Sequence, residues 1–145
     1  MSDSSVLFGN KAFSLKNPGG LTVLYFYPRD NTPGCTNQAK DFTRALPKFK
    51  KLRTRIVGVS QDSVESHEKF REKQGVGFTL VSDPDGDLCN RFEVIQEKSL
   101  YGRKFMGIVR STFLLDENGK TLKEWRKVKV PGHIDEVLKF LKDGE

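Results

Sequence analysis

LTVLYFYPRDNTPGC, residues 21–35, is the stretch from which the fold of this chain can be predicted. Its first seven residues form a continuous apolar and aromatic run, which is typical of a strand buried on both faces inside a helix-covered sheet. The polar turn RDNTPG follows and ends at Cys35, which we place at the start of a helix. A thiol between a central strand and a helix N-terminus is placed for reactivity.

The remaining sequence alternates between strand and helix patterns. We expect strands within residues 6–14 (a short edge strand), 55–60 and 77–81, and helices over residues 36–51, 63–74 and 84–92. Residues 95–105 are polar and predicted to be irregular, residues 108–116 and 121–127 form a hairpin around Asn118-Gly119, and a last helix follows His133. This order predicts an α/β, thioredoxin-like fold with a central mixed sheet flanked by helices.

Length and composition indicate a single domain over residues 1–145, because 36% hydrophobic and 30% charged residues are ordinary for a globular protein. No apolar run approaches the 18 residues of a transmembrane helix. Residues 1–11 lack the features of a secretory signal. Two cysteines are too few for a disulfide scaffold, so we expect a reducing compartment, the cytoplasm, and no membrane partner.

The net charge of +6 raises the question of nucleic acid binding. The basic residues are densest at residues 48–55 and 120–129, which are predicted to lie at a helix end and on a hairpin. Elsewhere the charges of both signs are scattered along the chain. We therefore expect a basic solvated surface and no nucleic acid partner, with a nucleic-acid-binding module as a minor alternative.

Cys35 has two predicted sources of activation. A free cysteine has a pKa of about 8.5, and both a helix N-terminus and a nearby cation lower the pKa of a thiol. The cation is Arg110, which lies inside an apolar strand pattern, where an unpaired charge is costly. Arg110 either pairs with the thiolate or points outward on an alternating strand, and the periodicity does not decide between them.

Thr32 and Pro28 complete the predicted site. In a tight turn the Thr32 hydroxyl can reach the space over the sulfur, although it is equally suited to a turn or capping role. Pro28 rigidifies the loop and limits the access of water, although prolines are also ordinary turn residues. Such a group suits attack of a thiolate on a polarised O–O bond, which leaves a sulfenic acid on the sulfur.

At these residues the chain resembles the peroxiredoxin family, in the motif formed by Pro28, Thr32 and Cys35 and in Arg110 within RSTF. The segments YFYPRDNTPGCT, GVSQDSVESHEKF, LVSDPD, MGIVRSTFLLDENG and WRKVKVPGH are similar to the peroxiredoxin Q (bacterioferritin comigratory protein) subfamily. The resemblance implies a thioredoxin fold and an antioxidant, thiol-dependent reduction of hydrogen peroxide and organic hydroperoxides, with no metal, haem, flavin or other cofactor.

The resemblance also implies a role for each matching residue. Cys35 is the peroxidatic cysteine, Thr32 and Arg110 bind the peroxide and activate the thiolate, and Pro28 shields the site. Many members carry a resolving cysteine at the places of Lys40 or Arg71, and neither position is a cysteine here.

Two further departures concern a charge and the length of the chain before the central strand. Three residues after the peroxidatic cysteine, where members of the family usually have a glutamate, this chain has Gln38, and the replacement removes a charge from the site. The segment before the strand at residues 21–27 is shorter than the resemblance implies.

Cys89 is the remaining cysteine, and we interpret it as a buried, inert core residue, with a resolving role as the alternative. The hypothesis is therefore a one-cysteine cycle in which thioredoxin, glutaredoxin or glutathione reduces Cys35, in a monomeric enzyme. A different hypothesis is a peroxide-sensing interaction protein with poor turnover that signals through a mixed disulfide.

Overall fold

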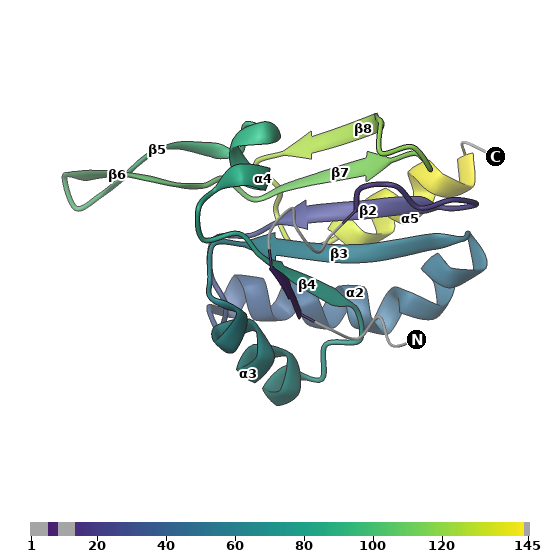
Figure 1. The fold of residues 1–145 in the computed structure, drawn as a ribbon, viewed down its shortest axis with the longest axis horizontal. Helices are drawn as coiled ribbons and strands as arrows, with labels where there is room; N and C mark the ends of the chain where they lie inside the picture. The colour runs from purple at the N-terminus through teal and green to yellow at the C-terminus, as the bar shows by residue number, and fades with distance from the viewer. Residues whose placement is uncertain (1–5, 9–13, 144–145) are drawn as a thin grey trace.

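The structure is a computed structural model that describes residues 6–8 and 14–143 (Figure 1). The strands are β1 (Val6–Phe8), β2 (Leu21–Phe26), β3 (Thr54–Ser60), β4 (Thr79–Ser82), β5 (Ile95–Leu100), β6 (Arg103–Ile108), β7 (Ser111–Leu115) and β8 (Thr121–Arg126). The helices are α2 (Pro33–Lys51), α3 (Val64–Gln74), α4 (Asp87–Arg91) and α5 (His133–Asp143). None of the described helices is both long and apolar enough to cross a membrane.

The six-stranded sheet has the order β1-β4-β3-β2-β7-β8, so the predicted strand β2 lies inside it. β2 pairs in parallel with β3 and antiparallel with β7, and β3 pairs in parallel with β4. α2 connects β2 to β3, and α3 connects β3 to β4, as parallel neighbours require. The mixed sheet flanked by helices confirms the predicted thioredoxin-like α/β class.

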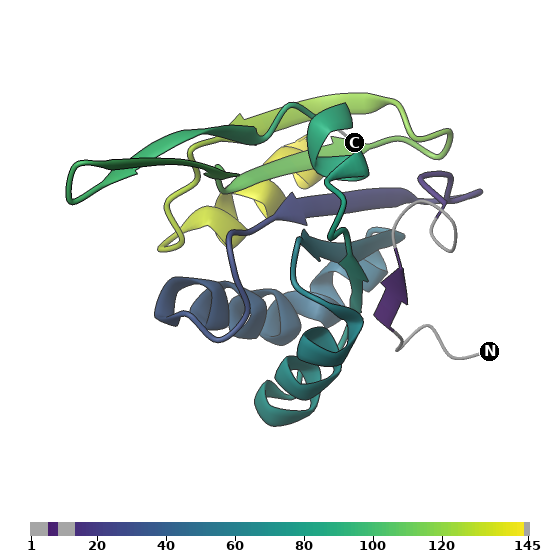
Figure 2. The ribbon, with the colours of Figure 1, turned by 60° about the vertical axis from the view of Figure 1, so that its left-hand side comes forward.

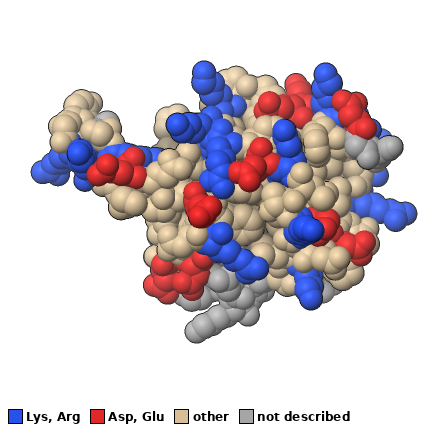
Figure 3. Space-filling model, turned by 90° about the horizontal axis from the view of Figure 1, so that it is seen from above, with Lys and Arg blue, Asp and Glu red and all other residues tan. Residues whose placement is uncertain are grey.

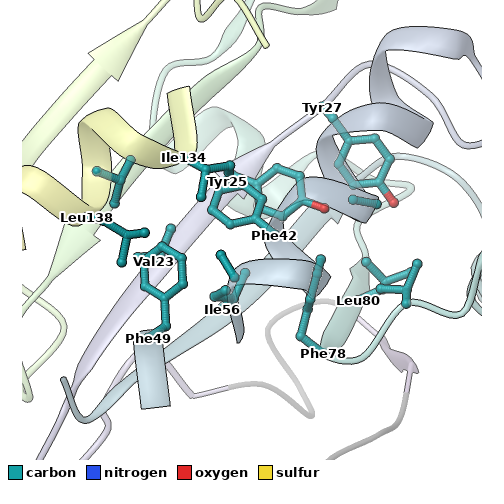
Figure 4. Packing of buried hydrophobic residues seen from close by; sticks show 14 of the residues in the cluster. Val23, Tyr25, Tyr27, Phe42, Phe49, Ile56, Phe78, Leu80, Ile134 and Leu138 are labelled. Atoms are coloured by element: carbon teal, nitrogen blue, oxygen red, sulfur yellow. The ribbon is translucent and has the colours of Figure 1, made fainter. Parts of the chain in front are cut away.

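Successive side chains of β2 supply two separate cores, because they point to opposite faces of the sheet. Val23 and Tyr25 pack beneath α2 and α5, in the cluster that also contains Cys35 (Figure 4). Leu24 and Phe26 pack on the opposite face. That second cluster is completed by Val57, Val59, Val81, Leu88, Cys89, Val94, Ile108, Phe113 and Leu115.

α2 begins three residues earlier than predicted. Thr32 has the extended backbone of an N-cap residue, and Pro33 occupies the first helical position, where its missing N–H costs nothing. Cys35 is therefore inside the first turn of the helix, rather than just before it. The last turn of α2 contains three lysines, Lys48, Lys50 and Lys51, whose positive charges interact favourably with the negative end of the helix dipole.

The ends of α3 confirm the capping signals in the sequence, whereas the start of α4 does not. The Ser63 hydroxyl accepts a hydrogen bond from the Ser66 amide, and Gly75 ends α3 in the left-handed conformation. The predicted start of a helix at Pro84 is wrong, because α4 begins at Asp87 after Gly86. The Asp83 carboxylate still caps α4, by accepting hydrogen bonds from amides in its first turn.

The prediction of an irregular segment at residues 95–105 is wrong. β5 and β6 form a two-stranded antiparallel hairpin that projects from the body (Figures 1 and 2). Tyr101 and Gly102, at its tip, both have positive φ, which suits the tight turn of a two-residue hairpin. Backbone hydrogen bonds pair the two strands. The side chains of residues 95–105 do not alternate between apolar and polar, so the sequence carried no strand pattern.

β1 lies at the edge of the sheet beside β4, which confirms the edge strand predicted within residues 6–14. The rest of the N-terminal prediction falls partly on residues 9–13, which lie outside the described residues. The shortened segment before residue 21 stays a prediction.

Candidate active site

Cys35 is the third residue of α2 and is 2% exposed. The first hydrogen bond of this helix runs from the Thr36 amide to the Thr32 carbonyl oxygen, at 2.8 Å. The amides of Gly34 and Cys35 therefore precede the helical hydrogen bonds. They place partial positive charge at the end of the helix that carries the sulfur.

Arg110 contacts the sulfur of Cys35, which decides between the two orientations that the sequence left open. Arg110 lies between β6 and β7, and its Nη2 donates to Cys35 Sγ at 3.3 Å. Its Nη1 donates to Gln38 Oε1 at 2.6 Å, and the side chain of Gln38 is fully buried in α2. The guanidinium thus bridges two residues on successive turns of α2.

The loop before α2 carries the other two predicted residues, Thr32 and Pro28. The Thr32 hydroxyl donates to the Arg29 carbonyl oxygen at 3.0 Å, which is a turn contact and not a contact with the sulfur. Pro28 is exposed at the start of the same loop. The roles of Thr32 and Pro28 toward a peroxide stay predictions.

Two buried polar atoms of this region lack a hydrogen-bond partner among the described residues: Tyr25 Oη and Gln38 Nε2. Burial raises the pKa of Tyr25 well above its usual range, and the nearby Cys35 and Asp30 raise it further, so the phenol keeps its proton. An unsatisfied buried donor costs roughly 1–3 kcal/mol. A bound oxygen atom could offset that cost.

A buried hydrogen-bond network holds the loop that carries the site. Asp30 accepts hydrogen bonds from the Tyr27 hydroxyl at 2.6 Å and the Ser66 hydroxyl at 2.8 Å. Its Oδ2 also lies 2.7 Å from Nδ1 of His67, which is fully buried in α3. His67 Nε2 lies 3.1 Å from the Val81 carbonyl oxygen, so both ring nitrogens face acceptors. This network attaches the loop to α3 and β4.

The same region contains the one cluster of metal-ligand atoms among the described residues, Asp30, Asp62 and His67. Its atoms already have protein partners. Asp62 Oδ2 accepts from the Asp30 amide and the Ser60 hydroxyl, both at 2.7 Å. The donor set fits an internal hydrogen-bond network better than a metal site, because its ligand atoms already lie within hydrogen-bond distance of other protein groups.

Cys89 belongs to the hydrophobic cluster on the face of the sheet opposite Cys35. Burial raises the pKa of the Cys89 thiol well above its usual range, and the Asp83 carboxylate raises it further. This thiol is therefore a poor nucleophile. The two positions where the subfamily resemblance implies a resolving cysteine hold Lys40 and Arg71. Lys40 is exposed, and Arg71 Nε donates a hydrogen bond to the Phe78 carbonyl oxygen.

The sequence interpretation missed the buried network and the role of Gln38 as a partner of Arg110. His67 lies fully buried in the first turn of α3. The available signal for Asp30 was its position in the short loop between the central strand and Cys35. Its partner could not be identified, because His67 is 37 positions away.

Comparisons with known proteins agree with this geometry. A protein-family model described as the AhpC/TSA family matches residues 7–123. The chain is 55% identical over 124 residues to peroxiredoxin Bcp of Xanthomonas campestris pv. campestris, a match that covers 86% of this chain and 78% of that protein. It is 50% identical over 125 residues to peroxiredoxin Bcp of Bacillus subtilis, covering 86% and 80%.

Solved structures give the same result. The structure of Xanthomonas campestris peroxiredoxin Q is similar with a TM-score of 0.82 and 54% identity, covering 86% of this chain and 79% of that one. A structure of the Xanthomonas campestris bacterioferritin comigratory protein has a TM-score of 0.82 and 53% identity, covering 87% and 80%. That work is described as giving insight into the alkyl peroxide reduction activity of the Xanthomonas protein.

Proposed function

This chain belongs to the AhpC/TSA family and is a peroxiredoxin, a thiol-dependent peroxidase, and we propose that it works by a one-cysteine cycle at Cys35. The observation that carries the proposal is the contact of Arg110 Nη2 with Cys35 Sγ at 3.3 Å. A guanidinium at this distance stabilises negative charge on the sulfur and on an oxygen that leaves from beside it.

In the first step, the Cys35 thiolate attacks one oxygen of a hydroperoxide. The S–O bond forms as the O–O bond breaks, so the sulfur becomes a sulfenic acid and the other oxygen leaves as hydroxide or alkoxide. That oxygen takes up a proton and departs as water or alcohol. Arg110 and the amides of Gly34 and Cys35 stabilise its charge. We propose that Thr32 orients the peroxide when it is bound.

In the second step, an external thiol reduces the sulfenic acid. We propose thioredoxin, glutaredoxin or glutathione for this step, because Lys40 and Arg71 replace the resolving cysteines that the subfamily resemblance implies. Cys89 is disfavoured as an internal partner by its position across the sheet and its raised pKa. Both cysteines are free, which fits the proposed location in the reducing cytoplasm.

The test is hydrogen peroxide consumption by the wild type, Cys35→Ser and Cys89→Ser, with thioredoxin, glutaredoxin and glutathione supplied in turn. We expect Cys35→Ser to lose turnover and Cys89→Ser to retain a rate within about twofold of the wild type. Equal rates for the wild type and Cys35→Ser would end the proposal. A stoichiometric burst without turnover, with every reductant, would instead favour the peroxide-sensing interaction protein.

A further inference from the structure

We propose that the oxidised site selects negatively charged thiols, with Lys98 and Arg110 as the cations that attract them and Gln38 as the neutral partner that leaves the Arg110 charge uncompensated. The proposal rests on the proposed one-cysteine cycle and names the chemical class of its reductant. It concerns only the second step, after the peroxide has reacted.

Lys98 lies opposite Phe105 in the outer half of the projecting hairpin, and its side chain reaches along the hairpin to Gly107, toward its base. It is on β5, and its aliphatic stem crosses the backbone at Gly107, where a Cβ would lie 3.3 Å from Lys98 Cδ. Gly107 is three residues before Arg110. Burial and the Arg110 guanidinium lower the pKa of Lys98, and Cys35 raises it, so all three groups share one electrostatic environment.

Neither Asp30 in the catalytic loop nor Glu97 on β5 forms an ion pair with Arg110 or Lys98 among the described residues. Asp30 is held by Tyr27, Ser66 and His67 in the buried network. Glu97 is the neighbour of Lys98 on β5 and therefore points to the opposite face of the hairpin. On the face viewed in Figure 3, the Lys and Arg side chains and the Asp and Glu side chains are interspersed.

Because the Gln38 side chain is neutral, the charge balance around Arg110 changes when Cys35 is oxidised. Arg110 donates to the neutral amide of Gln38 and to the sulfur, so the Cys35 thiolate is the one negative group among its two side-chain partners. Conversion of the thiolate to an uncharged sulfenic acid removes that negative charge. The two cations then face whatever enters the site, and an anion is favoured over a neutral or cationic molecule.

The step itself is an attack of the external thiolate on the Cys35 sulfur. An S–S bond forms, the S–O bond breaks, and the oxygen leaves as hydroxide, which takes up a proton to become water. A second thiolate then displaces Cys35 as a thiolate, so two thiols are oxidised to one disulfide and the site is reset. Cations beside the sulfur speed the approach of the thiolate in both attacks.

Three small thiols that differ in charge provide the probe: 2-mercaptoethanesulfonate, 2-mercaptoethanol and cysteamine. One equivalent of hydrogen peroxide first generates the sulfenic acid, and stopped-flow mixing then measures its reduction, with each rate divided by the thiolate concentration. At low salt we expect the sulfonate to react about three- to tenfold faster than 2-mercaptoethanol, and cysteamine to react more slowly by a similar factor. Added salt should compress these ratios.

Lys98→Gln is the main variant, and Lys104→Gln is its matched control. Both remove one positive charge from the same hairpin, but Lys104 is paired with Ser99, on the face opposite the Lys98–Phe105 pair. We expect Lys98→Gln to lower the ratio of the sulfonate rate to the cysteamine rate about tenfold. Lys104→Gln should leave this ratio unchanged. Gln38→Glu should lower it in the same direction as Lys98→Gln.

Two outcomes would overturn the proposal. One is a wild type that reduces at equal rates with all three thiolates, and the other is a Lys104→Gln variant that changes the ratio as much as Lys98→Gln. Both outcomes leave the peroxidase function intact, because the initial burst of peroxide consumption reports the first step separately. Absence of that burst in the wild type would contradict the proposed function itself.

Discussion

Gly34 lies beneath the guanidinium that contacts the catalytic sulfur. A Cβ at this position would lie 3.2 Å from Arg110 Nη2, which is closer than an ordinary van der Waals contact. The φ of Gly34 is not positive, so its backbone conformation does not require glycine. The absence of a side chain here therefore serves the close approach of Arg110 to α2.

We expect Gly34→Ala to separate activity from stability. Alanine is a better helix former than glycine, so the free energy of unfolding should stay unchanged or rise by up to about 1 kcal/mol. The added methyl group displaces the guanidinium by a few tenths of an ångström, and kcat/KM for hydrogen peroxide should fall about three- to tenfold. Denaturant unfolding and steady-state kinetics on the same preparation measure both.

The control for this variant is Asn37→Ala, an exposed position in the same turn of α2. This change should leave kcat/KM within about twofold of the wild type. A Gly34→Ala enzyme with wild-type activity would show that the contact of Arg110 with the helix start has no catalytic value.

At the scale of elements, α3 holds the catalytic loop through buried polar groups. The contact of His67 with Asp30 joins the first turn of α3 to the loop between β2 and α2. Both side chains are buried, at 0% and 1% exposure. Removing one partner of a buried hydrogen-bonded pair is costly, because polar atoms of the other partner are left unsatisfied.

We expect His67→Ala to lower the free energy of unfolding by about 3–5 kcal/mol. Ser66→Ala removes one of the hydroxyl donors to Asp30 and leaves the other contacts, so its cost should be about 1 kcal/mol. Urea unfolding of the two variants and the wild type measures the difference. A loss below about 1 kcal/mol for His67→Ala would mean that Asp30 is compensated by other groups.

α5 is attached to the sheet by a second buried histidine. His133 Nε2 lies 2.8 Å from the Thr112 hydroxyl oxygen of β7, and Nδ1 lies 3.1 Å from Glu136 Oε1. Burial lowers the pKa of His133, and the contact with Glu136 only partly opposes that effect. The folded protein therefore holds this imidazole in its neutral form more strongly than the unfolded chain does.

This shift predicts a loss of stability at acid pH. Because the pKa of His133 is lower in the folded state, the unfolded state binds more protons as the pH falls below the unfolded value of about 6.5. The contribution of His133 to stability is thus present above pH 6.5 and is lost as the pH falls through the folded pKa. We expect the free energy of unfolding to decline less steeply between pH 7 and pH 5 in His133→Gln. Parallel slopes for this variant and the wild type would contradict the assignment.

At the scale of the whole molecule, the central sheet separates the two cysteines. Cys35 belongs to the cluster beneath α2 and α5, and Cys89 belongs to the cluster on the opposite face. A disulfide requires the two Cα atoms to lie within about 7 Å, which a sheet between the residues does not permit. The fold therefore opposes an internal bridge.

We expect peroxide-treated protein to contain no Cys35–Cys89 disulfide. Treatment with one equivalent of hydrogen peroxide, followed by alkylation and peptide mass spectrometry, should find Cys35 as sulfenic acid or as a mixed disulfide and Cys89 as a free thiol. Cys89→Ser, treated in the same way, should give the same Cys35 products. An abundant bridge between the two cysteines would contradict the one-cysteine cycle and require unfolding of part of the sheet.

Much of the fold could be predicted because its signals are local. The apolar run of β2, the cap and stop residues Ser63 and Gly75 of α3, and the Asn118-Gly119 turn between β7 and β8 each act within a few residues. The wrong predictions also rested on local signals, but these signals were weak. The β5–β6 hairpin has polar strands, and Pro84 resembles a helix start that the chain uses instead as part of a turn before α4.

The sequence by itself determined the α/β class, the position of Cys35 between a buried strand and a helix, and the absence of a cysteine at positions 40 and 71. Only the tertiary structure decided that Arg110 turns inward to Cys35, 75 positions away, and that Asp30 meets His67. It also decided that Cys89 lies across the sheet. The physical reason is that strand pairing, here of β2 with β7, brings together segments whose local patterns carry no information about each other.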